Sequence, residues 1–219
     1  MIAAHHRREL EIESAISPDI IAERGTFTAE RGDDLPSAFA DWQRRPGLVF
    51  PIRDTTSEMV AWQLKADNPR LDKNNKPVKY DTAVNGRQCI DVPVRSRPHL
   101  GDPTVPLVIT EGAKKVDSGV SHGIRCIIGL QGVYGWRGTN EHGGKTALSD
   151  WEDIALNGRQ TTLAFDSDVM TKDTVRDALE RLSGFLSSRK ANVRYLLLPD
   201  LPNGEKCGLD DFFANGGML

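Results

Sequence analysis

The chain has 219 residues, of which 38% are hydrophobic and 27% charged; this apolar content supports one large or two small domains and excludes a disordered chain. A net charge of −3 argues against a protein that coats DNA by bulk electrostatics, and no uncharged apolar run reaches the length of a membrane span. Three scattered cysteines suit neither a disulfide framework nor a zinc ribbon, so we expect a cytoplasmic protein without a membrane partner.

The first hundred residues predict a small α+β region. Ser17 as N-cap, Pro18 at the first helical position and Gly25 at the end predict a short helix. The expected strands of this region are 48–52, 59–64, 78–82 and 88–92, the first two as a β-hairpin. The prolines of segment 93–105 make it the expected linker to the rest of the chain.

From Pro106 onward, short apolar runs alternate with helical segments. The expected strands are 106–110, 125–130, 161–165 and 193–198, and the expected helices are 112–121, 149–155, 172–189 and 210–214. Parallel strands need a crossover, which the helices supply, so the pattern predicts a parallel sheet. The expected fold class is therefore α/β, with a Rossmann-like sheet in 106–219 preceded by a smaller α+β region in 1–100.

Three carboxylates directly follow strands of this expected sheet. Glu111 follows the first strand, and Asp166 and Asp168 follow the third, so parallel strands bring all three to the edge where such sheets bind ligands. Carboxylates that meet repel each other unless a cation lies among them, and oxygen ligands select a hard metal such as Mg²⁺. The pattern favours metal-dependent phosphoryl or nucleotidyl transfer. An Asx turn at 166–168 and a favourable helix dipole at Glu111 are the simpler alternatives.

Three motifs in this half contain the acidic residues, namely Ile109-Thr110-Glu111-Gly112-x-Lys114-Lys115, Leu163-Ala164-Phe165-Asp166-Ser167-Asp168 and Gly208-Leu209-Asp210-Asp211-Phe212-Phe213. Together they resemble a Toprim domain of phage and plasmid replication proteins, similar to that of bacterial-type DNA primases. The resemblance implies that Glu111 is the general acid/base or a further ligand and that Asp166 and Asp168 hold Mg²⁺ or Mn²⁺. Gly208 stands where bacterial primases have an aspartate, and Asp210 and Asp211 fit the later acidic positions, which makes them further candidate metal ligands. Asp210 equally suits the N-cap of a helix.

Basic residues form the second set of candidates. The expected nucleotide-binding or nucleic-acid-binding residues are Lys65, Lys79, Lys114, Lys115, Arg137 and Lys145. Lys114 and Lys115 open a helix, where the dipole disfavours cations, and this conflict indicates contact with phosphate. The other four lie in a basic loop region and a glycine-rich loop, for which the alternative is a solvated surface without a ligand. A P-loop is excluded because Thr139 occupies the place of its first glycine.

The resemblance implies Mg²⁺-dependent nucleotidyl transfer on nucleic acid, namely primer synthesis in phage, plasmid or mobile-element replication. The partners would then be a single-stranded DNA template, nucleoside triphosphates, and a helicase or another replication protein. Two alternatives stay open: a Toprim nuclease that cleaves DNA, and a catalytically inactive module that binds DNA or a replication partner. Synthesis requires nucleoside triphosphates, whereas cleavage proceeds without them.

Overall fold

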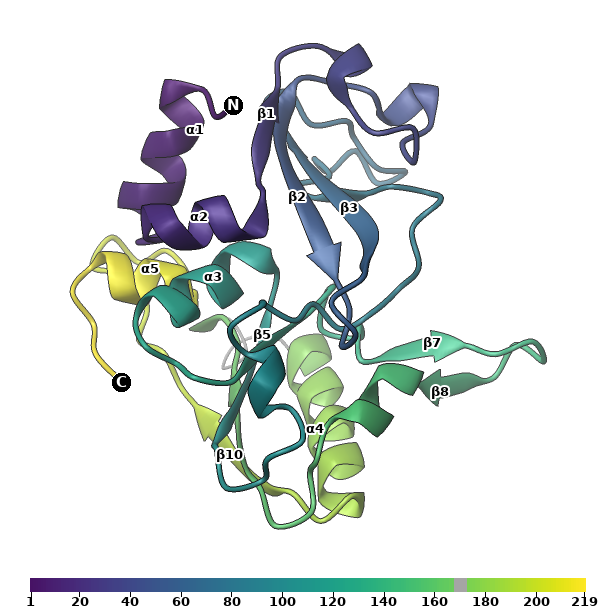
Figure 1. The fold of residues 1–219 in the computed structure, drawn as a ribbon, viewed down its shortest axis with the longest axis vertical. Helices are drawn as coiled ribbons and strands as arrows, with labels where there is room; N and C mark the ends of the chain where they lie inside the picture. Colours follow the sequence, from purple (N-terminus) through teal and green to yellow (C-terminus); the bar gives the residue numbers. More distant parts are fainter. Residues whose placement is uncertain (168–172) are drawn as a thin grey trace.

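The computed structural model describes residues 1–167 and 173–219 as two four-stranded sheets and one two-stranded sheet with helices around them (Figure 1). The helical segments are α1 (Ala4–Arg8), the π-helix η1 (Glu9–Glu13), α2 (Pro18–Arg24), η2 (Gly32–Asp34), η3 (Asp41–Gln43), η4 (Arg97–His99), α3 (Ala113–Ser121), η5 (Ser149–Asp153), α4 (Asp173–Ser188) and α5 (Leu209–Ala214). The strands are β1 (Phe27–Ala29), β2 (Gly47–Arg53), β3 (Met59–Ala66), β4 (Asp81–Thr82), β5 (Leu107–Glu111), β6 (Ile127–Leu130), β7 (Arg137–Thr139), β8 (Lys145–Ala147), β9 (Gln160–Ala164) and β10 (Asn192–Leu196).

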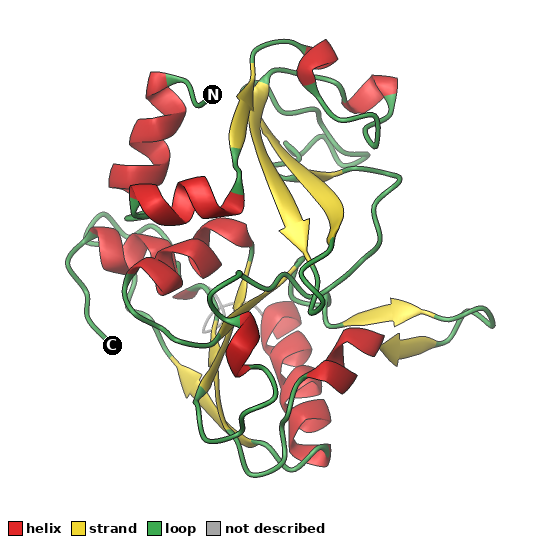
Figure 2. Ribbon diagram, in the orientation of Figure 1, coloured by secondary structure: helices red, strands yellow, loops and turns green. Residues whose placement is uncertain are grey.

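The first sheet is antiparallel, in the order β1-β2-β3-β4, and contains the predicted hairpin as β2 and β3. Figure 2 shows the N-terminal helices beside it. The predicted helix is confirmed as α2, and Gly25 ends it with φ +79°, a value that favours glycine. The predicted strand at 88–92 is wrong, because only Asp91 makes a β-bridge, to Gly129, while Ile90 is fully buried in the core.

The second sheet confirms the predicted parallel α/β fold. Its order is β10-β9-β5-β6 and all three pairings are parallel. Alternate residues of β5 face opposite layers: Leu107 and Ile109 pack with α4 and η5, whereas Val108 packs with α3 and α5. A sheet covered on both faces needs apolar residues on both sides, which explains the continuous apolar runs in the sequence. The carboxyl ends of its strands therefore share one edge.

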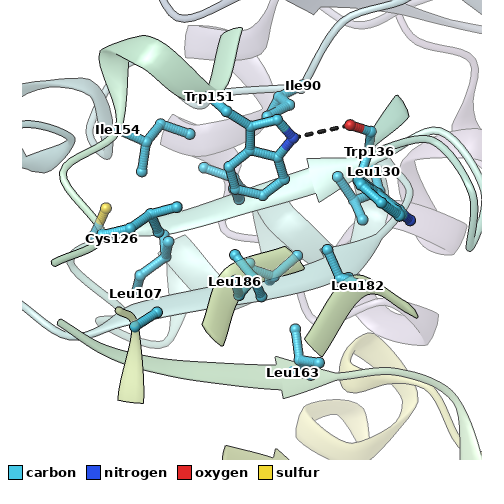
Figure 3. Close-up of a cluster of buried hydrophobic side chains, with 14 of the residues drawn as sticks. Ile90, Leu107, Cys126, Leu130, Trp136, Trp151, Ile154, Leu163, Leu182 and Leu186 are labelled. Atoms are coloured by element: carbon cyan, nitrogen blue, oxygen red, sulfur yellow. Dashed lines mark hydrogen bonds between the residues drawn. The ribbon is translucent and has the colours of Figure 1, made fainter. Parts of the chain in front are cut away.

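Trp151 closes the core on the α4 side of the parallel sheet (Figure 3). The segment predicted as a helix at 149–155 is the shorter 3₁₀ helix η5, which buries the Trp151 ring to 1% exposure. Its indole Nε1 donates a hydrogen bond to the Trp136 carbonyl oxygen at 2.9 Å. Because a buried indole N–H needs a partner, this bond fixes η5 against the chain that leads into β7.

The segment 93–105, expected to be a linker, is held against the parallel sheet by Arg159. This side chain is fully buried. Its guanidinium donates to the carbonyl oxygens of Val105, Leu100 and His99 at 2.8 Å each, and to Ala155 at 3.2 Å. A charge buried among several carbonyl oxygens is stabilised only while all of these bonds are made, so Arg159 fixes the path of this segment.

Arg24 joins the two parts of the chain. It is 6% exposed, and its Nε donates to Asp117 Oδ2 of α3 at 2.6 Å. Its Nη1 donates to Asp91 Oδ1 at 3.0 Å and to the Pro51 carbonyl oxygen of β2 at 3.1 Å. Around this network, α2, β2, α3 and α5 contribute to one apolar cluster. The antiparallel sheet is therefore held in a fixed place relative to the carboxyl ends of the parallel strands.

None of the helices within the described ranges has the length and apolar character needed to cross a membrane.

Candidate active site

The structure brings two of the predicted carboxylates to the same sheet edge. Glu111 is the last residue of β5, and Asp166 lies two residues after the end of β9. These strands are neighbours, with Ile109 opposite Leu163, so both carboxylates leave the sheet at its carboxyl edge. Glu111 is half-buried, and the Asp166 side chain is 13% exposed. Asp168, the third predicted carboxylate, lies outside the described residues.

The start of α5 adds two further carboxylates with different surroundings. Gly208 is the N-cap residue of α5, and its backbone N–H donates to Asp211 Oδ2 at 2.9 Å. Asp210, which the sequence also suited to the N-cap, is instead the second residue of the helix. Burial raises the pKa of Asp211, and the Gly208 hydrogen bond opposes this shift. Asp210 is 5% exposed, and its Oδ1 has no hydrogen-bond partner among the described residues. Such a buried oxygen suits a bound cation.

Four of the six predicted basic residues gather beside these carboxylates. Together with Lys206 they form what we call the lysine cluster: Lys65, Lys79, Lys114, Lys115 and Lys206. Lys79 lies just before β4, where partial burial and repulsion from the other four lysines lower its pKa. Lysines that repel each other at one surface are typical of a site for a polyanion.

Asp166 lies between two members of the lysine cluster. Lys115 Nζ is 3.1 Å from its Oδ1, and Lys206 Nζ is 2.6 Å from its Oδ2. Burial alone raises the pKa of Asp166, but the two ammonium groups outweigh it and hold the pKa below its ordinary value. Burial alone lowers the pKa of Lys115, but Asp210 and Asp166 outweigh it and raise the pKa. Asp166 is therefore an ionised carboxylate at neutral pH.

Glu9 and Lys206 belong to the site although the sequence analysis did not single them out. Glu9, from η1, accepts from Lys65 Nζ at 2.5 Å and lies 2.9 Å from Lys114 Nζ, which also donates to Ser14 Oγ at 2.9 Å. No local pattern marks Glu9, because both partners are distant in the chain. Lys206 stands two residues before the third motif, and this proximity was the only available signal.

Removing the Glu9 charge is expected to weaken the protein at neutral pH and much less in acid. Burial alone raises the Glu9 pKa, but Lys114 and Lys65 outweigh it and lower the pKa below 4.5. Its stabilising contribution is therefore present above about pH 4.5 and is lost as the pH falls through the folded-state pKa. Urea unfolding of Glu9→Gln should show a deficit of about 1–3 kcal/mol at neutral pH that shrinks towards about pH 3. A deficit independent of pH would contradict this assignment.

Arg137 and Lys145 lie elsewhere, on a hairpin that the sequence analysis expected to be a loop. Strands β7 and β8 form this hairpin, which projects from the body on the side away from α5 (Figure 1). The Arg137 guanidinium lies 4.7 Å from the centre of the Tyr134 ring, and Lys145 Nζ donates to Thr139 Oγ1. The structure therefore does not place these two residues with the lysine cluster.

A second group of residues could hold a metal ion. Within 1–167 and 173–219, the one set of three His, Cys, Asp or Glu side chains whose ligand atoms all lie within 4.8 Å of one another is His5, His6 and Asp67. Both ring nitrogens of His6 already have partners at 2.9 Å, Thr28 Oγ1 and Asp67 Oδ1. A neutral histidine satisfies both contacts without a metal. The donor set at the sheet edge, in contrast, includes Asp210 Oδ1, a buried oxygen that has no hydrogen-bond partner in the described part of the chain.

The fold is that of bacterial primase catalytic domains. A structure of Aquifex aeolicus primase with zinc-binding and RNA polymerase domains aligns with 98% of this chain and 53% of its own, at 14% identity and a TM-score of 0.64. The E. coli primase catalytic core aligns with 98% of this chain and 70% of its own, at 16% identity and a TM-score of 0.60. The primase fragment of the bacteriophage T7 primase-helicase aligns with 93% of this chain and 67% of its own, at 17% identity and a TM-score of 0.51.

Sequence comparison assigns the family. Residues 99–219 match the family described as "Domain of unknown function (DUF3854)", and the chain belongs to it. An uncharacterized protein of Picosynechococcus sp., SYNPCC7002_B0001, is 26% identical over 186 residues. That match covers 70% of this chain and 18% of the relative, so the chain corresponds to a small part of this longer protein.

Proposed function

We propose that the chain is a primase-like nucleotidyltransferase with a Toprim domain in residues 106–219. It would bind a divalent cation and a nucleoside triphosphate at the carboxyl edge of the parallel sheet. The observation that carries the proposal is the convergence of Glu111, Asp166 and the lysine cluster at this edge. Support comes from the shared fold with primase catalytic domains, one of which is described as bound to single-stranded DNA, at 16% identity and a TM-score of 0.61.

The residues divide the chemistry among them. Asp166, with Asp168 and the partnerless oxygen of Asp210, would hold Mg²⁺ or Mn²⁺, which offsets negative charge on the triphosphate. Glu111 would accept the proton of the attacking hydroxyl group. The positively charged lysine cluster would bind phosphate oxygens of the nucleotide and of the template backbone. Its members come from both parts of the chain. Primer synthesis in phage, plasmid or mobile-element replication, beside a helicase or another replication protein, is the biological role proposed.

One observation favours a second function, that of an inactive binding module. Both oxygens of Asp166 already contact lysine ammonium groups, so the carboxylate also has a structural role that needs no metal. Such a module would bind single-stranded DNA through the same lysines and catalyse nothing. A nuclease would use the same carboxylates without nucleoside triphosphates.

The experiment that separates these functions is incubation of the chain with single-stranded DNA, Mg²⁺ or Mn²⁺ and labelled nucleoside triphosphates. The proposal expects labelled oligomers that disappear when the triphosphates are omitted or when Asp166 is replaced by asparagine. Shortened DNA without incorporation would instead establish a nuclease. Retained DNA binding with neither product would establish the inactive module.

Replacing Lys79 by alanine is expected to weaken binding of single-stranded DNA by about three- to tenfold near physiological salt. Removing one phosphate contact should also reduce the slope of log affinity against log salt concentration by about 0.7. Fluorescence anisotropy at several salt concentrations measures both quantities. Lys76→Ala is the matched control, because Lys76 is an exposed lysine three residues away and outside the lysine cluster. Equal effects of the two variants would show that the lysine cluster is not the DNA-binding surface.

A further inference from the structure

The Lys115 side chain occupies the space that a side chain at position 208 would fill. The backbone at Gly208 has φ −94° and ψ 175°, which any residue adopts, so conformation does not require glycine there. A Cβ atom at this position would lie 2.3 Å from Lys115 Cε, 2.9 Å from Asp210 Oδ1 and 3.0 Å from Asp166 Oδ1. With glycine at position 208, the positively charged Lys115 side chain lies between Asp166 and Asp210.

The two lysines that contact Asp166 differ in how firmly they are held. Lys115 belongs to the first turn of α3, its side chain is 20% exposed, and it balances Asp210 as well as Asp166. Lys206 lies in the loop between β10 and α5, and its side chain is 54% exposed. An exposed ammonium group can exchange a carboxylate for water at little free-energy change, whereas a buried one cannot leave without uncovering unpaired charge.

Charge balance points in the same direction. Asp166, Asp210 and Lys115 meet around Gly208, and Lys114 Nζ lies 3.9 Å from Asp210 Oδ2. Of these two carboxylates Lys114 contacts Asp210 alone, so Lys115 is the cation that remains in place beside Asp166. With Lys206 in contact, each oxygen of Asp166 has one ammonium partner. A divalent cation at Asp166 would be repelled by both ammonium groups, and Lys206, as the more exposed of the two lysines, can withdraw into water at the lower free-energy cost.

We propose that Lys115 is the permanent cation of this site and that Lys206 is a displaceable one, so that a single divalent cation binds Asp166 in exchange for Lys206. The inference rests on the proposed function, which places a divalent cation at Asp166. It deepens that function by assigning separate tasks to the two lysines. Once released, Lys206 remains close enough to meet an incoming phosphate group.

The test is calorimetric titration of the full chain with Mn²⁺ alone, without nucleotide or DNA. All variants carry His5→Ala, which removes an exposed member of the His5, His6 and Asp67 group and keeps that group from contributing. The His5→Ala parent protein should bind one Mn²⁺ per chain, and the additional substitution Asp166→Asn should abolish this binding. Lys206→Gln should bind Mn²⁺ about fivefold more tightly, because the competing ammonium group is gone. Lys190→Gln, which changes an exposed lysine outside the site, should leave the affinity unchanged.

Lys115→Met provides a second readout, the thermal midpoint. Methionine extends as far as the Cε of lysine but lacks the charged ammonium group, so the midpoint should fall without metal and rise more with Mn²⁺ than it does in the parent protein. Equal Mn²⁺ affinity of Lys206→Gln and Lys190→Gln would overturn the inference. If the two variants bind Mn²⁺ equally and the parent protein incorporates nucleotides, the inference is wrong and the proposed function stands. If Lys206→Gln binds Mn²⁺ more tightly but the parent protein incorporates no nucleotide, the proposed function is wrong instead.

Discussion

Asp166→Asn is expected to reduce nucleotide incorporation at least about a hundredfold, because the neutral amide neither holds a divalent cation nor balances two lysines. The measurement is initial rate with single-stranded DNA and Mn²⁺ at saturating triphosphate. Asp33→Asn, which changes an exposed carboxylate outside the site, is the matched control and should keep full activity. Circular dichroism melting of both variants separates lost chemistry from lost folding. An Asp166→Asn protein that retains its rate would contradict the assignment.

Arg24→Met is expected to lower the free energy of unfolding by about 3–5 kcal/mol, the largest loss among the substitutions considered. Methionine fills much of the space of the arginine stem but leaves the buried carboxyl groups of Asp91 and Asp117 without their ion-pair partner. Urea unfolding at neutral pH measures the change. Arg95→Met is the matched control, because this half-exposed arginine also joins two carboxylates, Asp19 and Glu23 of α2, and its loss should change stability little. Similar losses for both variants would show that the Arg24 network does not hold the two parts together.

The parallel sheet could be predicted because local pattern and global fold agree there. Apolar runs such as 106–110 alternate with helical segments, as expected of buried strands between helical layers, and α4 shows clear helical periodicity. The β7 and β8 hairpin could not be predicted, because its strands are short, polar and largely exposed, without alternation. The segment 88–92, in contrast, was predicted as a strand and does not form one. An apolar run reports burial, and burial without strand pairing has the same appearance in sequence.

The candidate site also has one part that the sequence predicts and one part that it does not. The convergence of Glu111 and Asp166 followed from their positions at the ends of parallel strands, which needs no knowledge of side-chain contacts. The association of Lys65 with Glu9 depends on how the N-terminal helices pack on the first sheet, and a single sequence carries no signal for that packing. For the same reason, the sequence did not separate Arg137 from the lysines as a candidate phosphate-binding residue, although its hairpin lies apart from them.

The measurement that tests the central claim most directly is cleavage of the chain by Fe²⁺ bound at the proposed metal site. Fe²⁺ in place of Mg²⁺, with ascorbate and peroxide, generates hydroxyl radicals that cut the backbone next to the ion, and mass spectrometry locates the cuts. We expect cuts beside Glu111, Asp166 and Gly208 that vanish in Asp166→Asn. Cuts confined to the neighbourhood of His5, His6 and Asp67 would contradict the account and move the metal site away from the sheet edge.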